Sequence, residues 1–142
     1  MYENIIVTVD LADPNSWKKA LPTAVAFSQS FGSAIRLMTV VPEFGLASVA
    51  QYFPDDYTEK ATEAAEAELK ELAADNLPSD IPVEVSVAHG SPYSEILRIA
   101  KETGADLIIM TSHRPELKDY LLGPNAARVV RHADCSVMVL RG

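Results

Sequence analysis

The chain has 142 residues, of which 48% are hydrophobic and 23% are charged, and its formal net charge is −8. This balance is typical of a globular protein, and roughly 68–70% of the unfolded surface is buried at this length, so we expect one domain spanning residues 1–142. The negative charge disfavours non-specific binding to nucleic acid or anionic lipid, because their phosphates repel such a surface.

Five aliphatic runs predict β-strands, at residues 5–9, 35–41, 83–87, 107–110 and 137–140. Four of them are largely continuous, which is typical of strands buried on both faces in a parallel sheet. Only residues 83–87 alternate with polar residues, so this strand is expected at a sheet edge. The longest runs are too short to span a membrane, and the first strand begins without a basic leader segment, so we expect a cytoplasmic protein.

Four helical patterns separate the strands. Residues 16–31 carry an apolar stripe in which Pro22 is expected to kink the helix or delay its start, and residues 58–76 are rich in strong helix formers. Ser91-Pro92 and Gly104 delimit the third helix, and Gly123-Pro124 opens the fourth. The order β-α-β-α-β-α-β-α-β predicts an α/β fold, a doubly wound parallel sheet with helices on both faces.

Ligands in such sheets bind at the carboxyl ends of strands, where the strand order reverses. Asp10 directly follows the first strand, where its carboxylate can accept hydrogen bonds from ribose hydroxyls or can serve as an ordinary turn carboxylate. Thr8 and Val9, with Val40 of the neighbouring strand, form a candidate apolar slot for a flat base.

The loop after Met110 has a second set of candidate groups. Thr111, Ser112 and His113 offer hydrogen-bonding groups, and Arg114 offers a bidentate phosphate fork. Gly123 leaves room for an anion where Pro124 and Asn125 begin the next helix, at the positive end of its dipole. The alternative is a surface loop with Gly123 as a simple helix cap.

Several common devices are absent from the sequence. It contains neither Gly-x-x-x-x-Gly-Lys-Ser/Thr nor Gly-x-Gly-x-x-Gly, which disfavours a P-loop enzyme and a dinucleotide-binding domain. His89, His113 and His132 lack metal-ligand spacing, and Cys135 is interpreted as a small core residue rather than a reactive thiol. No nucleophile or general base stands out, so neither catalytic residues nor a protein-bound metal are predicted.

The C-terminal third resembles a known family. Two stretches carry the likeness: Ser112-His113-Arg114-Pro115, and the run from Tyr120 that reads Tyr-Leu-Leu-Gly-Pro-Asn-Ala-Ala-Arg-Val-Val-Arg-His-Ala-Asp-Cys-Ser-Val-Met-Val-Leu. Both closely resemble the universal stress protein family, in particular its UspF-type branch. The likeness covers essentially the whole chain. It implies a Rossmann-like sheet, of the adenine nucleotide alpha hydrolase type, with strand order 3-2-1-4-5.

The resemblance also implies ATP as the ligand, with Mg²⁺ held by the phosphates. Asp10 would then contact the ribose, and the adenine would lie against Thr8, Val9 and Val40. The phosphate loop would comprise Met110, Thr111, Ser112, His113, Arg114, Gly123, Pro124 and Asn125. A homodimer would form through the last strand, from Ser136 to Leu140.

This chain departs from the family's glycine-rich phosphate motif at three positions. Thr111 and Arg114 stand where that motif has glycines, and Pro124 replaces a Ser or Thr. If the lost hydroxyl and N–H had each bound phosphate directly, each loss costs roughly 1.5–3 kcal/mol, which Arg114 partly offsets with a charge-assisted contact.

The function expected from the resemblance is that of an ATP-binding stress-response regulator or interaction module, at most a slow ATPase. The alternative is a dimeric interaction domain that does not bind ATP. A phospho-accepting response regulator is disfavoured, because Ala88-His89 and Arg141 stand where that class needs Asp and Lys.

Overall fold

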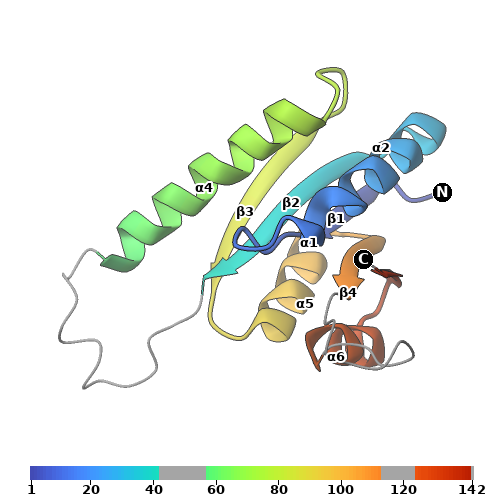
Figure 1. Ribbon diagram of the computed structural model, residues 1–142. Coiled ribbons are helices and arrows are strands. Elements are labelled where there is room, and N and C mark those ends of the chain that lie inside the picture. Colours follow the sequence, from blue (N-terminus) through green and yellow to red (C-terminus); the bar gives the residue numbers. More distant parts are fainter. Residues whose placement is uncertain (42–56, 113–123, 142) are drawn as a thin grey trace.

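The computed structural model describes residues 1–41, 57–112 and 124–141 (Figure 1). Its elements, in chain order, are β1 (Asn4–Thr8), α1 (Asn15–Lys18), α2 (Ala20–Phe31), β2 (Ala34–Val41), α4 (Tyr57–Asn76), β3 (Val83–His89), α5 (Pro92–Thr103), β4 (Leu107–Ser112), α6 (Pro124–His132) and β5 (Ser136–Arg141). The five predicted strands are all present.

The five strands form one parallel sheet in the order β3-β2-β1-β4-β5. This confirms the order implied by the resemblance and the edge position expected for residues 83–87. The continuous aliphatic run in β5 does not mark burial on both faces, however. β5 is the second edge strand, and Val137 to Leu140 are only half-buried, because no described strand covers its outer side.

Helices cover both faces of the sheet. In Figure 1, α2 and α4 lie on one face, and α5 and α6 lie on the other. Side chains of β1 alternate between the two cores, since Ile5 and Val7 pack against α2 and α4, while Ile6 packs against α5 and α6. On the second face, the Arg128 guanidinium lies 4.9 Å from the centre of the Tyr93 ring and joins α6 to α5.

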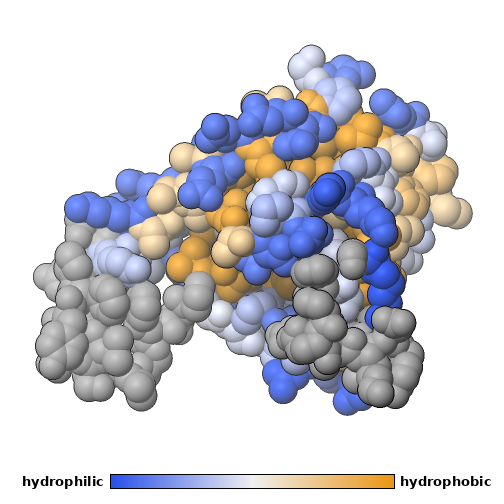
Figure 2. Space-filling model, in the orientation of Figure 1, coloured by the Kyte–Doolittle hydropathy of each residue, from blue (hydrophilic) through white to orange (hydrophobic). Residues whose placement is uncertain are grey.

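The helix predicted for residues 16–31 is interrupted. α1 ends at Lys18, α2 begins at Ala20, and Pro22 lies in the first turn of α2, where its missing N–H leaves no intrahelical bond unmade. The helical segment thus starts at Asn15 without delay and is broken at Lys19, three residues before Pro22. The surfaces of α2 and α4 follow their sequence patterns, since Figure 2 shows hydrophilic side chains on the outer side of α4 and apolar ones between the two helices.

Candidate functional site

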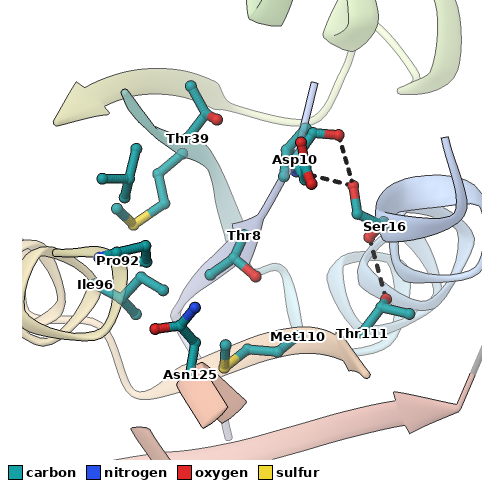
Figure 3. Close-up of a pocket in the computed structure, with 12 residues that line it drawn as sticks. Thr8, Asp10, Ser16, Thr39, Pro92, Ile96, Met110, Thr111 and Asn125 are labelled. Carbon is teal, nitrogen blue, oxygen red and sulfur yellow. Dashed lines mark hydrogen bonds between the residues drawn. The ribbon is translucent and has the colours of Figure 1, made fainter. Parts of the chain in front are cut away.

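A cavity of about 370 Å³ opens at the carboxyl edge of the sheet, where the strand order reverses between β1 and β4. Its volume falls within the usual range for small-molecule pockets. Figure 3 shows the lining side chains around this opening, with Thr39, Pro92 and Ile96 on one side and Asp10, Ser16 and Thr111 on the other. The switch point thus holds a pocket, as the α/β pattern predicts.

Seven of the twelve residues proposed from the sequence line this cavity: Thr8, Val9, Asp10, Val40, Met110, Thr111 and Asn125. Two others are described but are not among the lining residues. Ser112 is the last residue of β4, opposite Arg141 of β5, and Pro124 is the exposed first residue of α6. His113, Arg114 and Gly123 lie outside the described residues. The structure therefore brings the residues proposed for the base and the ribose into one pocket. Three of the residues proposed for the phosphates also line it, namely Met110 and Thr111 at the end of β4 and Asn125 of α6.

Five lining residues escaped the sequence analysis: Ser16, Met38, Thr39, Pro92 and Ile96. Met38 and Thr39 could have been found, because they precede Val40 at the same strand end. Pro92 and Ile96 belong to the first turns of α5, and the Ser91-Pro92 start signal together with the sheet order would have placed them at this edge. Nothing in the sequence singles out Ser16, since its role depends on the fold of the loop.

The walls of the pocket are mainly apolar. Val9, Met38, Ile96 and Met110 are buried, and they come from β2, β4, α5 and the residue after β1. The Val9 N–H donates to the Met38 carbonyl oxygen over 2.8 Å, so the backbone ladder extends one residue beyond β1. Such apolar walls suit the faces of an aromatic ring.

Asp10 is the only charged side chain among the described residues that line the cavity. Its carboxylate is exposed, and Oδ1 accepts the Ala12 N–H over 3.0 Å in a local turn. The turn carboxylate considered from the sequence is therefore present. Because a carboxylate can accept about four hydrogen bonds, this turn leaves acceptor capacity on a residue that lines the pocket.

Ser16 of α1 joins the two sides of the pocket. Its hydroxyl accepts the Asp10 N–H over 2.9 Å and donates to the Asp10 carbonyl oxygen over 3.1 Å. Its own carbonyl oxygen accepts the Thr111 hydroxyl over 3.1 Å, as the dashed lines in Figure 3 show. The Thr111 hydroxyl proton is thus committed to the protein main chain, which leaves the Thr111 oxygen as an acceptor.

Acidic and thiol groups offer little for a protein-bound metal in the described part of the chain. Within residues 1–41, 57–112 and 124–141, no group of three or more His, Cys, Asp or Glu side chains is arranged to hold a metal ion.

Over the same ranges, no helix combines the length and apolar character needed to cross a bilayer.

The sheet order, the helices on both faces and the pocket at the switch point define a Rossmann-like α/β protein. Residues 1–141 match the family model described as the universal stress protein family. The chain is 31% identical over 143 aligned residues to universal stress protein G of Escherichia coli O157:H7, covering 99% of this chain and 100% of that protein. This chain belongs to the universal stress protein family.

Solved structures agree with the assignment. Hypothetical protein MJ0577, the subject of a structure-based assignment of biochemical function, superposes with a TM-score of 0.82 at 27% identity, over 100% of this chain and 97% of that one. A universal stress protein in complex with cAMP superposes with a TM-score of 0.68 at 19% sequence identity, over 99% of this chain and 97% of that one. A universal stress protein from Archaeoglobus fulgidus in complex with dAMP superposes with a TM-score of 0.61 at 17% sequence identity, over 97% of each chain. The last two establish likeness of fold.

Proposed function

We propose that this chain is an ATP-binding universal stress protein that acts as a nucleotide-dependent stress-response regulator or interaction module. The observation that carries the proposal is the pocket at the switch point, which combines apolar walls with the Asp10 carboxylate on one side and the first turn of α6 on another. These are the three environments that a base, a sugar and a phosphate group require. The family neighbours in complex with cAMP and dAMP support an adenine nucleotide as the ligand class.

In this proposal the adenine lies against Thr8, Val9 and Val40, and the Asp10 carboxylate accepts hydrogen bonds from the ribose hydroxyls. The phosphate side comprises Asn125 and Pro124 at the start of α6, Met110, Thr111 and Ser112 at the end of β4, and the loop residues His113, Arg114 and Gly123. Since the described lining offers a single carboxylate, Mg²⁺ would be held by the phosphates and by water rather than by a protein cage.

Isothermal titration of ligand-stripped protein with ATP and Mg²⁺ tests the proposal. Wild-type protein should release or absorb heat with one site per chain, and Asp10→Asn should weaken binding by about tenfold, because it removes the charge from the sugar's acceptor. Asp75→Asn, on the exposed face of α4, is the matched control and should bind like wild type. No binding by wild type at millimolar ATP would overturn the proposal.

The second candidate is a dimeric interaction domain that does not bind ATP. Pro124 favours it, since the first residue of α6 offers neither a backbone N–H nor a hydroxyl to a phosphate. The same titration separates the two candidates. The interaction domain should show no heat of ATP binding although the protein is an intact dimer. Phosphate release from ATP, assayed on the same sample, decides whether the first candidate includes slow hydrolysis.

Other parts of the proposal follow from the family. We place residues 1–142 in a single universal stress protein domain, in the cytoplasm, with a homodimer formed through β5. The Ser112-His113-Arg114-Pro115 form supports a place in the UspF-type branch. Recovery of the untagged protein in the cytosolic fraction of its source cells tests the location.

A further inference from the structure

Ser16 is a half-buried residue of the short helix α1 that lines the pocket and contacts two separate segments of the chain. Its hydroxyl bonds both the N–H and the carbonyl oxygen of Asp10, and its carbonyl oxygen receives the Thr111 hydroxyl. One residue of α1 therefore holds the main chain after β1 and the side chain at the end of β4. These two chain segments form opposite sides of the switch point.

The contacts determine where the Asp10 carboxylate points. Asp10 follows β1, and the Asp10 carbonyl oxygen accepts both the Ser16 hydroxyl and the Asp13 N–H, the latter over 2.9 Å. With its N–H on the Ser16 oxygen as well, the Asp10 backbone is fixed on both sides of the residue. Among the described residues, the Ala12 N–H is the hydrogen-bond partner of the exposed carboxylate, so the direction of the carboxylate depends mainly on this backbone.

Fixing an acceptor before the ligand arrives strengthens binding, because the ordering entropy is not lost on association. Removing the Ser16 hydroxyl would leave the Asp10 N–H without its acceptor and would loosen the loop that carries the carboxylate, although the Asp13 N–H still bonds the Asp10 carbonyl oxygen. The carboxylate itself would remain present and charged. The loss would therefore affect the ligand groups that bind Asp10 more than the rest of the ligand.

We infer that Ser16 is a positioning residue that holds the Asp10 carboxylate in place to accept the vicinal hydroxyls of a sugar. This inference rests on the proposed nucleotide function and adds a specificity determinant to that site. Thr111 is the second member of the link, because its hydroxyl anchors the Ser16 main chain to β4.

The first test needs no ligand. Amide hydrogen exchange, followed residue by residue by NMR, should be at least about tenfold faster at Asp10 in Ser16→Ala than in wild type, since the amide loses its acceptor. The Val9 amide, bonded to Met38, is the internal reference and should be unchanged. Ser30→Ala, on the exposed side of α2, is the control variant and should leave both amides unchanged. Unchanged exchange at Asp10 in Ser16→Ala would overturn the inference.

The second test compares ATP with 2′,3′-dideoxyATP, which lacks both sugar hydroxyls. Wild type should bind ATP more tightly, and Ser16→Ala should weaken ATP binding by about tenfold while changing dideoxyATP binding much less. Ser16→Thr, which restores a hydroxyl, should recover the preference, and Thr111→Val should reduce it. In Ser16→Ala/Asp10→Asn the two losses should not add, because both act on one contact.

The outcomes separate this inference from the proposed function. If wild type binds neither nucleotide, the proposed function fails and the inference about the sugar fails with it, even where the exchange test succeeds. If wild type binds ATP but Ser16→Ala weakens ATP and dideoxyATP equally, the function stands and Ser16 is merely structural. Only a selective loss of the hydroxyl-dependent affinity supports the positioning role.

Discussion

Pro124 occupies the first position of α6, next to Asn125, which lines the pocket. Proline suits this position structurally, since its fixed φ fits the first helical turn and its missing N–H is not used within the helix. The same property removes a donor that a phosphate could use. At this one residue, helix formation and anion binding make opposite demands.

Pro124→Ser should therefore raise the affinity for ATP by about tenfold, equivalent to about 1.4 kcal/mol, because it restores a hydroxyl and a backbone N–H at the positive end of α6. Titration of the variant and of wild type measures the change. Pro22→Ser, in the first turn of α2 and outside the pocket lining, is the matched control. Equal or weaker binding by Pro124→Ser would contradict a phosphate at this helix start.

Cys135 lies just before β5 and is half-buried. Burial raises the pKa of its thiol, and the charges of Asp106 and Asp134 raise it further. A raised pKa leaves less thiolate at any given pH, so the thiol is less nucleophilic. This agrees with the interpretation of Cys135 as a small packing residue rather than a reactive one.

The midpoint of the pH profile for iodoacetamide alkylation of Cys135 should consequently lie above that of the same chain unfolded in urea. Asp134→Asn should shift the midpoint to lower pH, since it removes one of the negative charges. Asp106 is not replaced in this test, because its carboxylate accepts the N–H groups of Glu3 and Asn4 and its loss would also remove these hydrogen bonds. A folded-state midpoint at or below the unfolded one would refute the assignment.

At the scale of elements, two helices end in the same way. Gly32 follows α2 with a φ of 72°, and its N–H donates to the Ser28 carbonyl oxygen. Gly104 follows α5 with a φ of 67°, and its N–H donates to the carbonyl oxygens of Ala100 and Lys101. A Cβ at either glycine would meet no atom within 4 Å, so only the left-handed backbone requires glycine there.

Gly104→Ala should lower the free energy of unfolding by about 1 kcal/mol, because a Cβ disfavours the left-handed conformation. Gly104→Asn should cost less, since asparagine tolerates that conformation better. Urea denaturation of the three proteins gives the comparison. If Ala and Asn variants are equally stable, the cost does not arise from the backbone angle.

How far the sequence predicts these elements depends on whether the signal is local. Gly104 and Ser91-Pro92 delimit α5 as expected, because cap signals act within one turn, although the Ser91 side chain makes no capping hydrogen bond. The half-buried state of β5 could not be predicted from its continuous aliphatic run, since burial depends on which strand lies beside it. Ser16 was missed for the same reason, because its partners are 6 and 95 residues away along the chain.

At the scale of the whole molecule, the two sheet edges differ in chemistry. β3 carries Glu84 and Ser86, both bonded to the Arg36 guanidinium at 2.6 Å, whereas β5 carries four consecutive apolar residues from Val137 to Leu140. An apolar edge strand is the one that invites pairing with another chain. This difference supports β5 rather than β3 as the dimer edge.

Light scattering after gel filtration should accordingly give twice the 15.4 kDa chain mass for wild type. Val139→Lys should shift the protein toward the monomer, because a charge on an edge strand opposes pairing. Val87→Lys, at a half-buried position of the other edge strand, is the matched control and should remain dimeric. Circular dichroism should verify that both variants are folded. A monomeric wild type, or a monomeric Val87→Lys alone, would exclude pairing through β5.

The central position of β1 has a consequence for how occupancy of the pocket could be communicated. β1 is paired on both sides and packed on both faces, so Asp10 follows a strand that is held by neighbours in every direction. A ligand can move that strand very little. The first turns of α5 and α6 also line the pocket, yet each is covered on only one side by the sheet. The output of the site would therefore be a small displacement of these two helices, read on the face of the molecule that they form.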